Sequence, residues 1–328
     1  MISAPYLDLL DAALRPGLAG LSEPFVAAQA GFVAGCQRPD GGFGGRQGGS
    51  DLYYLDFALR TLAWLAPEHA AFERAADYLA CRTPTPRDTV ECFNLLNARR
   101  LLERRVALAL PVQPSSTADT GTGIASGTRD NSQPSCRQSL IARLGQCVLP
   151  GGGFARFAGD PRASAYHTFL GSLCYQMLGA EMSAVRDSIR AIESLRRPDG
   201  GYAELAGQAG SQTSATAAAL GFLTLHDATP ADTADSVQFL AAMQSQDGGL
   251  RPHTEVAGGD LLSTFTGLTT LWGLGGLDRI DLAGVARFLR DAACPGGGFL
   301  ACAADDTPDA EYTYYGVATL ALLRVLEG

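Results

Sequence analysis

Residues 244–272 read QSQDGGLRPHTEVAGGDLLSTFTGLTTLW, and this stretch decides the fold. Asp247, Gly248 and Gly249 form a turn that ends one helix, because glycine accepts the left-handed conformation of a helix C-cap. Asp260 is a favoured residue at the start of a helix, and the residues after it are apolar and small. The stretch therefore predicts a helical hairpin.

The same pattern returns along the chain at a nearly fixed interval. A large apolar residue follows each glycine turn, at positions 43, 154, 202, 250 and 299, and the last three steps are 48, 48 and 49 residues. The first gap, of 111 residues, has room for one degenerate repeat and an insertion. Such a period is typical of an architecture built from one repeated unit. Six hairpins with glycine-rich turns predict an all-α (α/α)6 toroid.

Length and composition favour one large domain. The chain has 328 residues, of which 46% are hydrophobic and 18% charged, so it can bury a large core. We therefore expect a single toroid domain over residues 1–328. Residues 111–135 are rich in Ser, Thr, Gly and Pro and poor in apolar side chains, which predicts a disordered surface insertion.

Charge and cysteine content exclude several classes of function. A net charge of −9 argues against nucleic acid as a partner, and all 25 basic residues are Arg. Without Lys, the chain has neither Schiff-base chemistry nor a P-loop. The eight cysteines form no CxxC pair, and no apolar run reaches membrane-spanning length. We therefore expect reduced thiols in a cytoplasmic protein without a membrane-spanning segment.

The glycine turns carry a resemblance to a known superfamily. The segments 37–45, 197–202 and 244–250 each place Asp-Gly-Gly before a large apolar residue, and an inner helix rich in small residues follows. They resemble the repeats of protein prenyltransferase β subunits and terpene cyclases of the squalene/hopene type, and the resemblance covers nearly the whole chain outside the insertion. It implies the α/α-toroid fold and an isoprenoid or isoprenoid diphosphate as ligand. For the prenyltransferase branch it also implies a separate helical partner subunit, which one sequence leaves open.

The resemblance implies a zinc site that this sequence does not match. In the prenyltransferases the metal is held by an Asp, a Cys and a His, and these positions match Asp260, Leu262 and Tyr312 here. Leu and Tyr do not supply the sulfur and imidazole ligands that zinc prefers. We therefore expect no zinc site of the family type and no firm cofactor, with magnesium left open.

This sequence also has fewer basic residues at the positions of the prenyltransferase diphosphate site. The family places Arg and Lys in the loop before the fifth inner helix, and this loop offers Arg251 and His253. Arg46 lies in the equivalent loop of another repeat and could reach an anion at the same rim. Arginine pairs suit a diphosphate, although each could also be a solvated loop arginine.

The cyclase branch implies an initiating acid at a different place. Its D-x-D-D motif aligns best with residues 212–220, which contain no acid. Asp260, Asp309 and Glu311 lie instead at neighbouring inner-helix starts. A carboxyl in an apolar mouth could have a raised pKa and protonate an alkene. The alternative for Asp260 and Asp309 is that they cap their helices.

Aromatic side chains recur near the starts of the inner helices. Such a set could line an isoprenoid cavity and stabilise a carbocation, or it could pack the core. The candidates for substrate binding are Tyr54, Tyr166, Phe265 and Tyr314, with Trp272 at the cavity floor and His167 at the rim. His226 is expected to be peripheral.

Three functions remain open from the sequence. The first is a prenyltransferase-like enzyme that acts on an isoprenoid diphosphate without zinc. Asp260 and Tyr312 would then occupy the positions of two zinc ligands of the prenyltransferases. The second is a terpene-cyclase-like enzyme in which Asp260, Asp309 or Glu311 is the general acid. The third is an inert toroid that binds a lipid or a protein. A cavity filled by Tyr312, Tyr314 and Phe265 would favour the third.

Overall fold

The computed structural model describes residues 5–82, 85–106 and 136–327, and the predicted insertion at 111–135 lies outside them. The described residues form thirteen α-helices and one short 3-10 helix, η1 (Leu277–Arg279). The inner helices are α3 (Leu52–Leu65), α5 (Thr89–Glu103), α7 (Ala165–Leu178), α9 (Thr213–Leu225), α11 (Leu261–Gly273) and α13 (Ala310–Glu327). The outer helices are α2 (Glu23–Gly35), α4 (Ala71–Arg82), α6 (Cys136–Gly145), α8 (Val185–Glu193), α10 (Ala234–Ala242) and α12 (Leu282–Ala292), and α1 (Tyr6–Ala19) precedes them.

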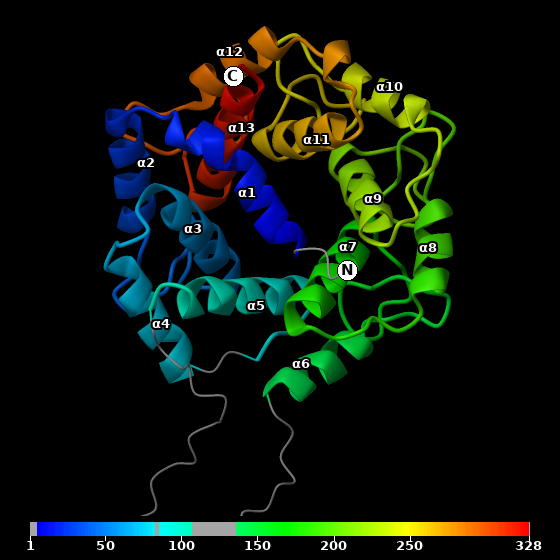
Figure 1. The fold of residues 1–328 in the computed structure, drawn as a ribbon, viewed down its shortest axis with the longest axis horizontal. Helices are drawn as coiled ribbons and strands as arrows, with labels where there is room; N and C mark the ends of the chain where they lie inside the picture. The colour runs from blue at the N-terminus through cyan, green and yellow to red at the C-terminus, as the bar shows by residue number, and fades with distance from the viewer. Residues whose placement is uncertain (1–4, 83–84, 107–135, 328) are drawn as a thin grey trace, which may run out of the picture.

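The inner helices form a closed ring. Each inner helix packs against the next one in the chain, and α13 packs against α3, so the last repeat meets the first. Figure 1 shows the outer helices around this ring, with the colours running once around the circle. The predicted (α/α)6 toroid is confirmed. None of the described helices combines the length and the apolar composition needed to cross a membrane.

The glycine turns fit closely against the next outer helix. Gly248 has φ +96°, and a Cβ there would lie 2.1 Å from the carbonyl oxygen of Gly284 in α12. The turn of the last repeat packs in the same way against α2 of the first repeat. A Cβ on Gly297 would lie 2.3 Å from the carbonyl oxygen of Ala28 in α2. Only glycine permits both the conformation and the approach. The turns therefore set the spacing of the ring and help to close it.

The large apolar residue after each turn fills a place made by its own inner helix. Phe154, Leu250 and Phe299 are buried, and each meets a glycine in its repeat. A Cβ on Gly267, for example, would lie 2.4 Å from Leu250 Cδ2. The pairs are Phe154 with Gly171, Leu250 with Gly267 and Phe299 with Gly316. This contact explains why small residues recur in the inner helices.

A threonine connects the turn to the inner helix in each of the last four repeats. Leu250 donates its buried N–H to Thr264 Oγ1 at 2.9 Å, and this hydroxyl donates to the carbonyl of Asp260 at 2.6 Å. We call this arrangement the threonine bridge. The equivalent N–H groups of Phe154, Tyr202 and Phe299 bond to Thr168, Thr216 and Thr313 at 2.9, 2.9 and 3.2 Å. The bridges hold the starts of these four inner helices in the same register.

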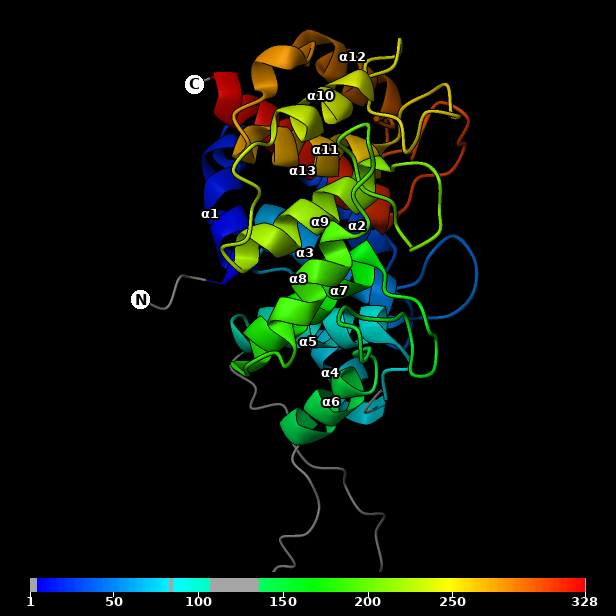
Figure 2. The same ribbon diagram turned by 90° about the vertical axis from the view of Figure 1, so that its right-hand side faces the viewer.

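The two ends of the ring differ. The loops that lead into the inner helices project to one side, on the right in Figure 2, and we call this end the mouth. Helix α1 lies at the opposite end. There Asp8 accepts hydrogen bonds from Arg104, which directly follows α5, at 2.8 and 3.1 Å, and the Tyr6 N–H donates to Gln176 of α7 at 2.8 Å. The helical pattern of these residues is visible in the sequence, but their position across one end is not.

The threonine bridge can be tested at Thr264. We expect Thr264→Val to lower the free energy of unfolding by about 1–3 kcal/mol, because the buried Leu250 N–H then has no acceptor. Thr269→Val is the matched control, since that hydroxyl bonds only to carbonyls of its own helix and its loss should cost less than about 0.5 kcal/mol. Urea unfolding measures both, and equal losses would contradict the role of the bridge.

Candidate active site at the mouth

The predicted acids Asp260 and Asp309 both cap inner helices. Asp260 accepts hydrogen bonds from the N–H of Ser263 at 2.7 Å and from its hydroxyl at 2.8 Å. Asp309 accepts from the N–H of Tyr312 at 3.0 Å and from Arg46 Nε at 3.1 Å. Burial raises the pKa of both carboxyls. The oxygens of both groups are therefore engaged in holding the structure together.

The residue two positions after each cap occupies an equivalent place in all six repeats. The register set by the helix starts puts these side chains around the mouth. They are Tyr53, Val90, Tyr166, Ser214, Leu262 and Glu311. Glu311 is the only carboxyl among them, and its neighbours in the set are aromatic, apolar or small. This position was among the predicted acids, but the ring that surrounds it becomes apparent only from the register.

Glu311 is a buried carboxyl with a protonation equilibrium near neutral pH. Its side chain is 8% exposed, and the Tyr53 hydroxyl donates to Oε1 at 2.7 Å. Burial is the main cause that raises its pKa to about 7, and the nearby Asp309 and Asp260 carboxyls add to this. The hydrogen bond from Tyr53 acts in the opposite direction, because it stabilises the carboxylate. Such a group can both hold and release a proton at neutral pH.

Arg46 connects the loop of the first repeat to the loop of the last. Its Nη1 and Nη2 donate to the two oxygens of Asp305 at 2.7 and 2.5 Å, and its Nε donates to Asp309 at 3.1 Å. The hydrogen bonds to Asp305 are the main cause that raises the pKa of Arg46. We call these three residues the mouth clasp. The guanidinium that was predicted to bind a diphosphate is already paired with two carboxylates.

A pocket of about 450 Å³ opens beside the mouth clasp. It is lined by Arg46, Tyr54, Ala301, Cys302, Ala304, Asp305, Asp309, Glu311 and Tyr312. The structure thus brings together five residues that the sequence analysis selected from opposite ends of the chain: Arg46, Tyr54, Asp309, Glu311 and Tyr312. Asp305 completes the group. Its carboxylate and that of Asp309 make the clasp side of the pocket acidic.

The predicted anion ligands of the fifth repeat lie elsewhere. Arg251 donates to the carbonyl oxygens of Ala242 and Met243 at 2.8 and 3.4 Å, and so satisfies the C-terminal end of α10. His253 is half-buried in the following loop. Neither lines the mouth pocket. The sequence could not show this, because an arginine that caps a helix and one that binds a ligand look alike.

The predicted aromatic ligands divide into core and exposed groups. Tyr314 is fully buried, with Trp64 stacked on it at 4.9 Å and the Arg60 guanidinium 3.9 Å from its ring centre. Phe265 is also buried. Tyr166, in contrast, is 37% exposed. Trp272 is half-buried near the C-terminal end of α11, away from the mouth.

His167 is part of a separate hydrogen-bonded group at the start of α7. Its Nδ1 lies 2.6 Å from the hydroxyl of Ser164, which caps the helix and donates to Glu204. Burial lowers the pKa of His167 to about 4, so the ring is neutral at pH 7. Glu204 comes from the loop of the next repeat, and no sequence signal marks it. His167 is therefore a hydrogen-bonded, neutral histidine at the rim, as one of the sequence interpretations had it.

The zinc site implied by the family does not fit these residues. Leu262 has no ligand atom, and both oxygens of Asp260 already accept hydrogen bonds from Ser263. Across the described ranges, no three His, Cys, Asp or Glu side chains are placed to share a metal ion.

A sequence comparison with family models identifies the chain. The model of the prenyltransferase alpha-alpha toroid domain matches residues 12–83, 125–249 and 175–327. The chain belongs to this family. A comparison with curated proteins finds no match.

Several solved structures have a similar fold. Candida albicans protein geranylgeranyltransferase-I complexed with GGPP aligns with a TM-score of 0.66 and 13% identity, covering 90% of each chain. A variant of the type II terpene cyclase MstE from Scytonema, in complex with geranylgeranyl dihydroxybenzoate, aligns with a TM-score of 0.57 and 13% identity over 96% of this chain and 98% of that one. The ligand-free cyclase gives 0.54 and 14%, over 98% of each chain. At these identities the likeness concerns the fold alone.

The raised pKa of Glu311 predicts a pH-dependent stability. Folding favours the protonated form, so the wild type loses stability as pH rises from about 4.5 to above 7. Glu311→Gln keeps an acceptor for Tyr53 but carries no charge. We expect it to be more stable than the wild type by on the order of 3 kcal/mol at pH 8 and equally stable at pH 4.

Urea unfolding of both proteins across this range measures the difference. Other buried carboxyls also titrate in this range; burial raises the pKa of Asp56, for example, to about 6. They do so in both proteins, so their contributions cancel in the difference between the two unfolding free energies. A difference that does not change with pH would show that Glu311 ionises at its ordinary pKa.

Proposed function

We propose that this toroid is a terpene-cyclase-like enzyme in which Glu311 donates the proton that starts cyclisation of an isoprenoid chain. One observation carries the proposal: the Glu311 carboxyl is buried at the mouth, accepts a hydrogen bond from Tyr53 and has a pKa that burial raises to about 7. A general acid works best when its pKa lies near the working pH. Asp260 and Asp309 are less suited, because their oxygens are occupied by capping and by the mouth clasp.

The reaction balances without a cofactor. Glu311 gives its proton to one carbon of a terminal double bond, and the other carbon becomes a cation that the next double bond attacks. The final cation loses a proton, so the product is an isomer of the substrate. Tyr53 stabilises the carboxylate that remains, since it already donates to Oε1 at 2.7 Å. The exposed face of Tyr166 is suited to stabilise the developing cation.

The charges at the mouth disfavour a diphosphate substrate. A diphosphate needs several free cations, whereas Arg46 is bound to Asp305 and Asp309 and Arg251 is bound to backbone carbonyls. The carboxylates of the clasp would also repel it. This arrangement supports a substrate whose polar end is not a diphosphate, and it weighs against prenyl transfer.

A second candidate is a toroid that binds its ligand without reaction. The observation in its favour is that Tyr314 and Phe265, both predicted to line the cavity, are buried in side-chain packing. Tyr312 is half-buried and lines the mouth pocket. The packing of these residues therefore accounts for part of the expected cavity, and an activity assay separates the two candidates.

The structural neighbours suggest which probes to use. Both kinds of neighbour were solved with a geranylgeranyl chain, as the diphosphate GGPP or as geranylgeranyl dihydroxybenzoate. We would compare these two compounds with geranylgeraniol, which carries the same chain without a charge. The reactions would run in D2O and be followed by mass spectrometry.

We expect a cyclic product from a probe without diphosphate, with one deuterium bound to carbon. Glu311→Gln should lower the rate by at least about 100-fold, because the proton donor is lost. The rate of the wild type should fall as pH rises through about 7, since only the protonated acid is active. Tyr53→Phe should move this midpoint to higher pH, because its hydrogen bond stabilises the carboxylate.

Asp260→Asn is the matched control, since Asn also caps helices: its Oδ1 can accept from the Ser263 N–H, and its NH2 can donate to the Ser263 hydroxyl. It should retain most of the activity. Three outcomes would contradict the proposal: a Glu311→Gln variant as active as the wild type, release of diphosphate from GGPP with transfer of the chain, or tight binding of the probes without any product.

A further inference from the structure

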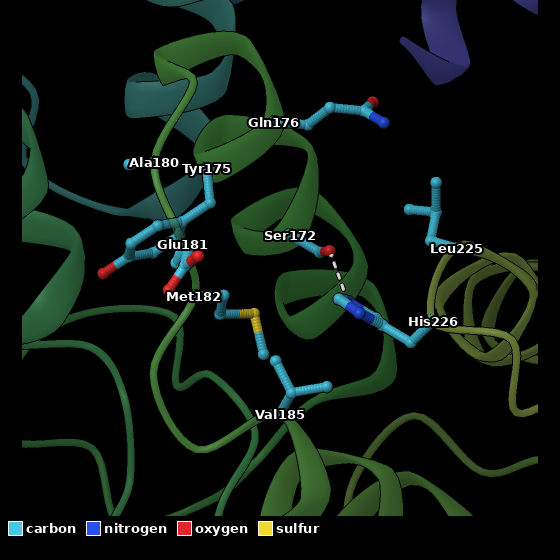
Figure 3. Close-up of a pocket in the computed structure, with 9 residues that line it drawn as sticks. All are labelled: Ser172, Tyr175, Gln176, Ala180, Glu181, Met182, Val185, Leu225 and His226. Atoms are coloured by element: carbon cyan, nitrogen blue, oxygen red, sulfur yellow. Dashed lines mark hydrogen bonds between the residues drawn. The ribbon is translucent and has the colours of Figure 1, made fainter. Parts of the chain in front are cut away.

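A second pocket lies away from the mouth, at the C-terminal ends of two inner helices. It has a volume of about 410 Å³, within the range of small-molecule sites of about 300–1,000 Å³. Its walls come from α7, the end of α9 and the segment that leads into α8 (Figure 3). The residues that matter below are Ser172, Met182, Val185, Leu225 and His226.

Ser172 and His226 form a hydrogen-bonded pair on the wall of this pocket. The Ser172 Oγ lies 2.8 Å from His226 Nε2, and Figure 3 shows the two side chains pointing toward each other. His226 also packs on Phe222, with ring centres 4.7 Å apart. Burial lowers the pKa of His226, so the ring is neutral at pH 7. The expectation that His226 is peripheral missed this arrangement, which joins two neighbouring inner helices.

The pair differs from the Ser164–His167 pair at the start of α7. The Ser164 hydroxyl caps α7 and donates to Glu204, so its hydrogen-bonding capacity is used within the structure. Ser172 lines a pocket, and a hydroxyl can donate one hydrogen bond and accept two. The Ser172–His226 pair therefore has capacity left for a ligand that both donates and accepts.

The other residues that line the pocket indicate which net charge a ligand can carry. No arginine lines the pocket, so an anion would have no partner. Glu181, its only charged residue, is exposed to solvent, and a cation placed deeper would lie beside a histidine that burial keeps neutral. Ala180, Met182, Val185 and Leu225 supply apolar surface. The pocket favours an uncharged molecule.

We infer that this pocket is a second ligand site, for a small uncharged molecule with an apolar body and a hydroxyl group that hydrogen-bonds to the Ser172–His226 pair. The apolar body packs on Met182, Val185 and Leu225. The site is separate from Glu311 and does not depend on the proposed reaction.

NMR of the histidine side chains tests the inference directly. The chain has only four histidines, and the signals that disappear in the His226→Gln variant are those of His226. The probes are 4-butylphenol, 4-butylbenzoate and 4-butylbenzylammonium, which share an apolar body and differ in charge. We expect 4-butylphenol to shift the ring-nitrogen signals of His226 saturably and to leave those of His167 unchanged. Ser172→Ala should weaken its binding about tenfold through loss of a hydrogen bond.

Val185→Phe provides a second test that leaves the hydrogen-bonded pair intact. Val185 is half-buried at the start of α8, and the larger side chain should fill the pocket and abolish the shifts. The inference is overturned if 4-butylphenol leaves His226 unchanged, if either charged probe binds as well, or if both variants bind like the wild type. None of these readouts requires catalytic activity.

Discussion

The threonine bridge is the interaction on which the geometry of the mouth depends. In the fifth repeat, one hydroxyl takes the buried N–H of Leu250 and donates to the carbonyl of Asp260, so the turn and the inner helix are held together at a fixed distance. Four repeats use it in the same way. These four helix starts are fixed by the bridge, and α3 and α5 begin at the equivalent caps Asp51 and Asp88. The residue two positions after each cap therefore reaches an equivalent place, and a ring of six side chains is produced.

Glu311 derives its chemistry from that ring. A carboxyl in water would ionise well below neutral pH, but here tyrosine, valine, serine and leucine, none of them charged, occupy the equivalent positions of the other repeats. Loss of hydration raises its pKa, and the two capping carboxyls raise it further, while one hydrogen bond from Tyr53 limits the shift. The raised pKa costs stability at neutral pH, and the proposed function explains this cost as the means of keeping an acid ready for proton transfer. The same acidic surroundings are the reason that the proposed substrate has no diphosphate.

The sequence predicted the toroid well, because glycine turns are local and their period is visible along the chain. Asp260, Asp309 and Glu311 were also placed correctly at helix starts. What it could not give were contacts that ring closure creates: Tyr53 with Glu311, and Arg46 with Asp305, join the first repeat to the last. For similar reasons the burial of Tyr314, the backbone partners of Arg251 and the pairing of His226 with Ser172 were not predictable. The first and the last depend on neighbours distant in sequence, and the partners of Arg251, eight and nine residues away, depend on how its loop folds back on α10.

The most direct measurement is a titration of the Glu311 carboxyl by ¹³C NMR, with Glu311→Gln used to identify its signal. The account predicts a midpoint near pH 7, because burial favours the protonated form, and a higher midpoint in Tyr53→Phe. A midpoint near 4.5, the ordinary value for glutamate, would mean that the carboxyl is hydrated and ionised at neutral pH. The proposed proton donor would then be wrong.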